Sequence, residues 1–195
     1  MSEKERKTMA ARKPDVRVER SRRALTEAFS SLILERRRYD QITIGALIER
    51  AGISRSTFYE HFKNKDEVLA ASMEYPFSLL AGCATNEMAC NGLPGLLEHF
   101  WSHRDQARAI FGGVARRVMS RALARTIAEL LARSKGADDP VQVRLISRAL
   151  AEAQLGSLFA WFNGDVSCSP AQIAEMLTRI SRLWIVPVTF SRRID

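Results

Sequence analysis

Apolar positions recur with the period of an α-helix along most of this chain. Between residues 15 and 37 they fall at i, i+3, i+4, i+7 and i+8, the spacing of one helical face. That face consists of Leu25, Ala28, Phe29, Leu32 and Ile33. No stretch of any length alternates between apolar and polar positions in the way that a half-buried strand does. The pattern therefore predicts an all-α fold with about nine helices.

Two short helical patterns lie close together in residues 43–65. The first has an apolar stripe formed by Ile44, Leu47, Ile48 and Ala51. Gly52 follows this stripe, where a left-handed residue costs least and a helix can end. Ser54 then stands where an N-cap is needed. The second pattern buries Phe58 and Phe62, which are spaced i, i+4.

Two helices joined by a tight turn, with a polar outer face on the second, are typical of a helix-turn-helix. That polar face carries Arg55, Ser56, Thr57, Tyr59 and His61. Arg55 can donate two hydrogen bonds to guanine, and Tyr59 can reach a phosphate or a thymine methyl group. Ser56 and Thr57 suit a base edge or a phosphate, and Thr43 opens the first helix where a phosphate can bind. The pattern predicts a DNA reader, although some of these side chains could simply solvate the helix.

Many positions in this segment together resemble a known family. They are Thr43-Ile44, Leu47-Ile48, Ala51-Gly52-Ile53-Ser54, Thr57-Phe58-Tyr59, His61-Phe62 and Lys63-Asn64-Lys65-Asp66-Glu67. They are similar to the DNA-binding signature of TetR-family transcriptional regulators, and the resemblance runs from about residue 18 to residue 69. It implies that the positions of Tyr59, His61 and Lys65 touch the DNA backbone or bases. Lys63 and Lys65 complete the expected contacts, because Lys65 opens a fourth helix whose N-terminus suits a phosphate.

Positive charge is concentrated in the N-terminal third of the chain. The formal net charge is +8, and residues 1–65 alone hold 16 Lys and Arg against 9 Asp and Glu. Hydrophobic content of 46% and charged content of 27% are those of an ordinary globular protein. A basic segment on a balanced chain favours a polyanionic partner. Charge alone would favour a solvated basic face with no partner, but here the charge coincides with the helix-turn-helix.

Residues 1–14 are polar and basic and predict a flexible arm. Such an arm could follow the minor groove of DNA or form no contact at all. Four arginines then crowd the first turns of the long first helix: Arg17, Arg20, Arg22 and Arg23. Cations near a helix N-terminus oppose its dipole, so phosphate contact is the expected reason for them, with Arg22 as the candidate.

A boundary between two domains is expected near residue 65. Residues 15–65 form the predicted three-helix DNA-binding domain, and residues 66–195 form a larger helical domain for effector binding and dimerisation. Asn64 can cap the fourth helix while Glu67 reaches back to the preceding backbone. This helix is expected to continue to about residue 81 with Pro76 inside it. A mid-helix proline usually kinks a helix, and the kink is compatible with either a hinge or local packing.

The last two predicted helices, at about 141–162 and 169–186, are apolar over a wide arc. A helix of this kind is buried on more than one side, and the second side suits another subunit. The resemblance implies that these helices form a four-helix bundle with those of a partner. The expected interface residues are Leu145, Ala149, Gly156, Ile173, Leu177, Ile180 and Trp184. A symmetric dimer would place two recognition helices about 34 Å apart on a palindrome.

The resemblance also implies a pocket for a small effector inside the larger domain. Such a pocket is mostly apolar with a few polar groups. Its candidate residues are Met73, Phe77, Trp101, Phe111, Met119, Phe159, Phe162, His99, His103 and Gln154. Aromatic and methionine side chains at helical spacing are also typical of an ordinary core, so both interpretations stand.

His99 and His103 share a helix face at i, i+4, but the sequence supplies no third metal ligand with supporting spacing. Cys83, Cys90 and Cys168 include no C-x-x-C pair, so reduced thiols without a metal are expected. No phosphate-binding glycine loop or nucleophile elbow occurs. We therefore expect neither an enzyme nor a cofactor; an enzyme using the histidine pair is the remaining alternative and would hold a metal.

The N-terminus has no apolar segment of the kind found in secretory signals, and no apolar run approaches the length of a membrane span, so a cytoplasmic protein is expected. The favoured hypothesis is a homodimeric regulator, a repressor released from a palindromic operator in double-stranded DNA by a small, largely apolar effector. The alternative is an architectural or partner-recruiting DNA-binding protein without an effector.

Overall fold

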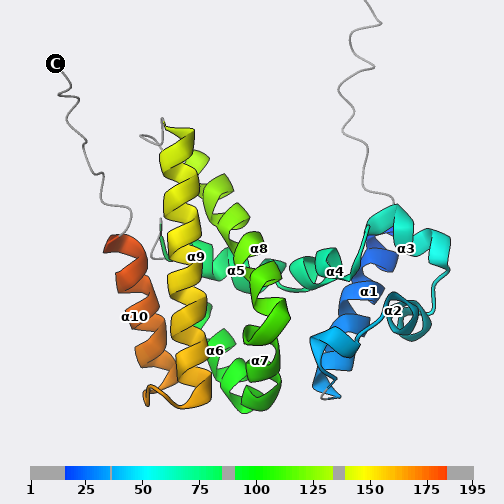
Figure 1. Cartoon of the computed structure of the whole chain (residues 1–195), viewed down its shortest axis with the longest axis horizontal. Coiled ribbons are helices and arrows are strands. Elements are labelled where there is room, and N and C mark those ends of the chain that lie inside the picture. The colour runs from blue at the N-terminus through cyan, green and yellow to red at the C-terminus, as the bar shows by residue number, and fades with distance from the viewer. Residues whose placement is uncertain (1–15, 36, 85–90, 134–138, 184–195) are drawn as a thin grey trace, which may run out of the picture.

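The computed structural model describes residues 16–35, 37–84, 91–133 and 139–183. In these residues all regular structure is helical, with ten α-helices and one short 3-10 helix (Figure 1). The predicted all-α class is confirmed, and the described part holds ten α-helices where about nine were expected. The predicted basic arm, Cys90 and Trp184 lie outside the described residues.

The first group of helices comprises α1 (Val16–Leu34), η1 (Tyr39–Gln41), α2 (Ile44–Ala51) and α3 (Arg55–His61). The buried residues of α1 are the five expected from the apolar spacing: Leu25, Ala28, Phe29, Leu32 and Ile33. α2 and α3 both pack against α1. Leu47 of α2 and Phe58 of α3 are fully buried in this core.

The expected fourth helix is two helices, α4 (Lys65–Ser72) and α5 (Glu74–Gly82), with Met73 between them. The start of α4 has the predicted caps, because Asn64 Oδ1 accepts from the Glu67 amide at 3.0 Å and Glu67 Oε2 accepts from the Lys63 amide at 2.8 Å. The prediction of one helix interrupted by Pro76 is wrong. Pro76 is the third residue of α5, where a missing N–H leaves no intrahelical bond unmade.

The second group comprises α6 (Leu93–Ser102), α7 (Arg104–Phe111), α8 (Gly113–Ala132), α9 (Pro140–Asn163) and α10 (Pro170–Leu183). α8 and α9 pack along each other, and α10 packs against both α9 and α6 (Figure 1). α9 ends at Gly164, whose φ of 86° is the left-handed conformation that glycine adopts without strain. Trp161 Nε1 donates to Cys168 O at 2.9 Å and fixes the connection from α9 to α10.

The two groups meet through a small set of elements. α4 extends from the first group towards the second (Figure 1). α8 packs against η1, which precedes the helix-turn-helix, and against α4 and α5, which follow it. Any shift of α8 would therefore be felt on both sides of the helix-turn-helix, which lies between η1 and α4 in the sequence.

Candidate nucleic-acid interface

The turn between α2 and α3 is built by two local features. Gly52 ends α2 with φ 64° and ψ 36°, a left-handed conformation. Ser54 is the N-cap of α3, and its Oγ accepts from the Thr57 amide at 3.1 Å. Because both features are set by neighbouring residues, the turn forms where the local sequence places it.

Arg55 and Tyr59 stand out from the surface of α3. Both are exposed, Tyr59 at 49%, and the Arg55 guanidinium lies 5.8 Å from the centre of the Tyr59 ring. This contact holds a planar donor over an exposed ring, an arrangement that can meet a base edge. The neighbouring hydroxyls of Ser56 and Thr57 lie 2.8 and 2.9 Å from Ser54 Oγ, so both belong to the cap.

His61 and Arg22 connect elements of the first group. His61 Nε2 lies 2.7 Å from Ser21 Oγ, which joins the end of α3 to α1. The Arg22 guanidinium lies 5.6 Å from the centre of the Phe62 ring and pairs with Glu74 at 3.4 Å. Both expected DNA contacts therefore already have partners within the chain.

Thr43 and Lys63 are exposed at helix ends, where a DNA phosphate could reach them. Thr43 is the N-cap of α2, its Oγ1 accepts from the Ala46 amide at 3.1 Å, and it is exposed. Lys63 is exposed at the end of the turn after α3. Lys65 is partly buried, and its ammonium group donates to the backbone carbonyls of residues 39, 40 and 42.

An ion pair that sequence reasoning missed braces α2 against α1. Arg50 Nη1 donates to Glu35 Oε1 at 2.6 Å and to Ser31 Oγ at 2.6 Å, and Arg50 Nη2 donates to Glu35 Oε2 at 3.0 Å. The hydrogen bond from Arg50 lowers the pKa of Glu35 below its ordinary value. Opposite charges 15 residues apart are too common in a sequence to single out this pair before the fold is known.

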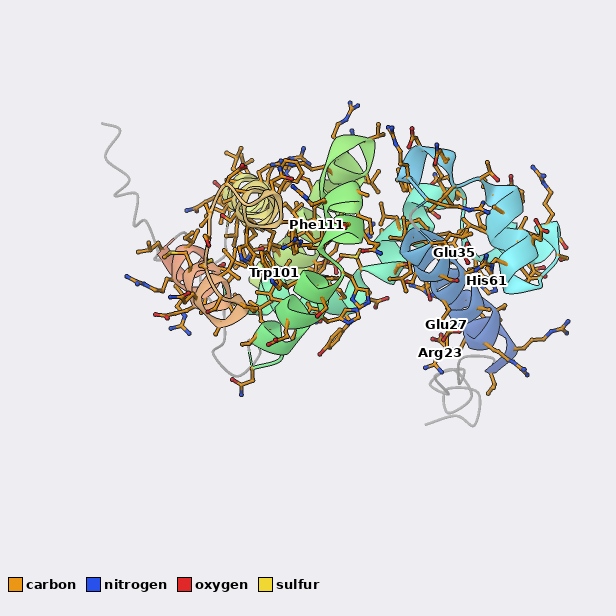
Figure 2. The ribbon with its side chains drawn as sticks, turned by 90° about the horizontal axis from the view of Figure 1, so that it is seen from below. Arg23, Glu27, Glu35, His61, Trp101 and Phe111 are labelled. Carbon is orange, nitrogen blue, oxygen red and sulfur yellow. The ribbon has the colours of Figure 1, made fainter. Side chains whose placement is uncertain are left out.

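The effector-pocket candidates are distributed through the C-terminal group. Met73, Phe77, Phe111, Met119, Phe162 and Gln154 are buried, Trp101, Phe159 and His103 are partly buried, and His99 is exposed. Trp101 stacks on Trp161 with ring centres 4.6 Å apart, and Phe111 lies 5.2 Å from Phe162. Figure 2 shows Trp101 and Phe111 among the C-terminal helices, away from His61 and α1. These aromatic candidates form part of a packed core.

Gln154 is the candidate with an unusual environment. It is fully buried on α9, and its Nε2 donates to Leu80 O at 2.9 Å and to Ser181 Oγ at 2.8 Å. Its Oε1 is buried without a hydrogen-bond partner among the described residues. The amide thus links α5, α9 and α10 and leaves one acceptor available.

Two open clefts lie where the two groups of helices meet. One of about 980 Å³ lies between α1 and the α4–α5 segment, and Arg23, Glu27 and Glu35, labelled in Figure 2, line its α1 side. The other, of about 740 Å³, lies between the end of α3, α4, α5 and α8. Of the pocket candidates, only Phe77 lines either cleft, so these clefts are not the interior pocket that was expected.

The histidine pair lies as its spacing implies, with the rings of His99 and His103 4.7 Å apart. His103 Nδ1 lies 3.0 Å from the His99 carbonyl oxygen. Within the part of the chain that the structure describes, no group of three or more His, Cys, Asp or Glu side chains is arranged to hold a metal ion.

The expected dimer residues divide into two sets. Leu145 is 67% exposed, whereas Ala149, Gly156 and Ile180 are partly buried. Ile173 and Leu177 are buried within the subunit, at 4% and 0% exposure, so assigning them to a dimer interface is wrong. Their stripe faces inward, where α10 packs on α6 and α9. Met176 and Leu183 belong to the same wide apolar arc but were not among the expected interface residues, and they are 48% and 75% exposed on α10.

The turn between α2 and α3 and the exposed face of α3 are those of a helix-turn-helix protein. Residues 33–72 match the family described as bacterial regulatory proteins of the tetR family. A curated relative, the uncharacterized HTH-type transcriptional regulator YxbF of Bacillus subtilis (strain 168), is 40% identical over 60 residues. The match spans 31% of this chain and 16% of that relative. Both sequence matches fall on the segment that holds the helix-turn-helix, and there the chain is similar to TetR-family transcriptional regulators.

A solved structure shares the overall fold. The TetR transcriptional regulator from Rhodococcus sp. RHA1 aligns with a TM-score of 0.53 and 17% identity, over 88% of this chain and 99% of that one. The N-terminal helix-turn-helix and the larger C-terminal helical group therefore occur together in both chains. No described helix is long and apolar enough to cross a membrane.

Proposed function

We propose that the protein is a homodimeric, sequence-specific DNA-binding regulator that acts in the cytoplasm on a palindromic operator. The observation that carries the proposal is the exposed pair of Arg55 and Tyr59 on α3, directly after a capped turn. The pair lies where a recognition helix presents its N-terminal residues to the major groove. The basic N-terminal third supplies attraction to the phosphate backbone.

Dimerisation through α9 and α10 is supported by apolar side chains that the subunit leaves exposed. Leu145 of α9 and Met176 and Leu183 of α10 are each about half or more exposed. Large exposed apolar side chains on neighbouring helices are typical of a surface covered by a second subunit. A two-fold axis there would pair two recognition helices on one operator.

Repression relieved by a small, largely apolar effector is the favoured mode of regulation. Its support is the buried acceptor of Gln154 among apolar side chains of α5, α9 and α10. A ligand with one donor group could satisfy it, and the link from Gln154 to α5 offers a route towards α4. The joint at Met73, rather than Pro76, is then the position at which α5 could turn relative to α4.

The alternative is an architectural or partner-recruiting DNA-binding protein without an effector. One observation favours it: the aromatic candidates for the pocket pack directly on one another, as at Trp101 with Trp161. Under this alternative, no small apolar compound would change operator affinity or thermal stability.

Selection of bound sequences from a random DNA library tests the proposal most directly. We expect a palindromic motif whose half-sites lie about 34 Å apart along the duplex, or a multiple of that distance. Enrichment of single half-sites would remove the dimer from the proposal, and no enrichment at all would remove sequence-specific binding. Titration of the selected operator complex with apolar compounds would then separate the effector version from the alternative.

A further inference from the structure

A carboxylate lies in the middle of the face that α9 leaves uncovered. Leu145, Ala149, Glu152 and Gly156 follow one another at i, i+4, i+7 and i+11, so they share one side of the helix. All four are exposed or partly buried in the subunit, and the Glu152 side chain is 43% exposed. The buried residues of α9 lie on the opposite side. The Glu152 carboxylate is therefore the charged centre of an otherwise apolar stripe.

Two arginines and a serine surround this carboxylate. The buried Ser120 hydroxyl of α8 donates to Glu152 Oε1 at 2.6 Å. Arg148 Nη2 lies 3.5 Å from Glu152 Oε1, and Arg116 Nη2 lies 3.6 Å from Glu152 Oε2. We call Arg116, Arg148 and Glu152 the Glu152 cluster. Its carboxylate is fixed from the α8 side, because its one short hydrogen bond comes from a buried hydroxyl.

The Glu152 cluster keeps hydrogen-bonding capacity that the subunit does not use. Both arginine contacts are longer than ordinary N–H···O hydrogen bonds, in which the N···O distance is about 2.7–3.2 Å. Among the described residues, Glu152 Oε2 therefore accepts no hydrogen bond, and the Arg148 guanidinium donates none. The Arg148 side chain is 48% exposed. A charged donor and a charged acceptor are thus both available to a second molecule on the α9 face.

A second copy of the chain supplies both partners that these groups need. A partner helix can approach Glu152 closely, because Ala149 and Gly156 on either side of it are small. Covering this face would take the charges of Arg148 and Glu152 out of water, which is strongly unfavourable unless each charge gains a partner. About a two-fold axis, Arg148 of one protomer can pair with the partner's Glu152, and the reverse contact follows by symmetry.

We propose that Arg148 and Glu152 form reciprocal ion pairs between two copies of this chain and make the copies select each other over other chains. This inference rests on the proposed dimer and names the residues that determine its specificity. Apolar side chains such as Leu145 and Met176 supply attraction that is not directional and depends little on the identity of the partner. A chain without a matching guanidinium and carboxylate would leave the two charges buried and unpaired, which disfavours the mixed dimer.

Charge reversal tests the proposal and includes its own rescue. Glu152→Arg places like charges at both contacts between the subunits, and so does Arg148→Glu. Each variant alone should dimerise about a hundred-fold or more weakly than the wild type in analytical ultracentrifugation, because two favourable contacts become repulsive. In a mixture of the two variants every arginine at these positions faces a carboxylate. Native mass spectrometry of the mixture should therefore show heterodimers in large excess over both homodimers.

The doubly reversed chain tests self-selection directly. Combining Arg148→Glu with Glu152→Arg restores opposite charges in its own dimer but places like charges against the wild type. This double variant should form homodimers and leave wild-type chains to pair with each other. Arg121→Glu is the control, because Arg121 is an exposed arginine that lines the cleft between α8 and α4. It should dimerise like the wild type and mix with it freely.

Glu152→Arg also loses the Ser120 hydrogen bond, so its melting curve by circular dichroism must show that it is folded. Arg148→Glu keeps that bond, and wild-type dimer affinity in this variant would by itself overturn the proposal. Weak dimers that the mixture does not rescue would also overturn it, because the cluster would then act within one subunit. Random mixing of the single variants in a dimeric protein would overturn the inference alone, whereas a monomeric wild type would overturn the proposed dimer as well.

Discussion

Arg55 and Tyr59, spaced i, i+4 on α3, form a candidate DNA-contact surface without contacts from residues far away in the sequence. Both lie on the exposed face of α3, and the guanidinium rests 5.8 Å from the ring centre. The ring limits the directions that the guanidinium can take, so less side-chain freedom is lost when it meets a base. Specificity at this surface should therefore depend on single residues.

Replacing Arg55 with Ala should relax specificity at one base pair, at a cost of about 1–3 kcal/mol in operator affinity. The reason is the loss of a two-pronged donor to a base edge. Affinity for operators substituted one position at a time is the measurement. Arg117→Ala, which removes an exposed arginine of α8, is the matched control and should change nothing. An equal loss on every sequence in Arg55→Ala would show that Arg55 binds only phosphate.

Tyr39 should make stability depend on pH in the alkaline range. Burial first, and then the bond to Asp66, raise its pKa from the ordinary value of 10.0, so the folded protein keeps the phenolic proton where the unfolded chain releases it. The contribution is complete below pH 10 and declines as the pH rises further. Tyr39→Phe should be less stable at neutral pH but lose less stability between about pH 10 and 11. Urea unfolding across this range measures it.

Tyr75→Phe is the matched control for Tyr39, because Tyr75 is 63% exposed. It should follow the wild-type pH dependence. A Tyr39→Phe variant with the same alkaline decline as the wild type would show that other groups account for that decline.

At the scale of elements, short local signals determine where the helices in and next to the helix-turn-helix begin and end. Gly52 and Ser54 define the turn, and Asn64 with Glu67 defines the start of α4. The joint at Met73 comes three residues before Pro76, which in one continuous helix would leave the Ser72 carbonyl without its N–H donor. At Met73 the backbone reaches φ −98° and ψ 7° between the two helices.

Gly52→Ala should destabilise the protein by about 1–2 kcal/mol, since φ 64° is a left-handed conformation that costs an L-residue about that much. A Cβ at this position meets no atom within 4 Å, so the cost is that of the backbone alone. Gly95→Ala is the control, because that glycine is helical and a Cβ there is also free of contacts. It should be neutral or stabilising by up to about 1 kcal/mol. Chemical unfolding of both variants compares them, and equal effects would contradict the role of the turn.

At the scale of the molecule, the long helix α8 connects the helices of the proposed dimer interface with those of the proposed DNA-binding surface. α8 packs against α9 on one side and against η1, α4 and α5 on the other. The Ser120 hydroxyl on α8 donates to Glu152 of α9 at 2.6 Å, and Arg116 pairs with the same carboxylate at 3.6 Å. A change at the proposed dimer helices therefore reaches the DNA-reading end through direct packing.

Leu145→Glu should dissociate the proposed dimer, because a carboxylate would be buried against an apolar partner surface. Val114→Glu is the matched control, since Val114 is 60% exposed on α8 and Leu145 is 67% exposed on α9. Analytical ultracentrifugation should show a monomer for Leu145→Glu and a dimer for Val114→Glu. A dimer of unchanged affinity in Leu145→Glu would place the interface elsewhere.

Much of the fold and of the α3 surface was predictable from local pattern. The stripe of α1, the left-handed Gly52 and the Ser54 cap depend on residues within one or two helical turns, so periodicity and capping rules reach them. The exposed pair of Arg55 and Tyr59 is local in the same sense. For these features the sequence by itself was sufficient.

Features that depend on residues far apart in the chain were decided only by the tertiary structure. Lys65 finds its acceptors 23 to 26 residues earlier, so the local sequence gave no sign of these carbonyl contacts. Ile173 and Leu177 lie on an apolar arc whose inward side is chosen by contact with α6 and α9. Helical periodicity shows that a face is apolar, whereas the packing of the other helices determines which part of that face is covered.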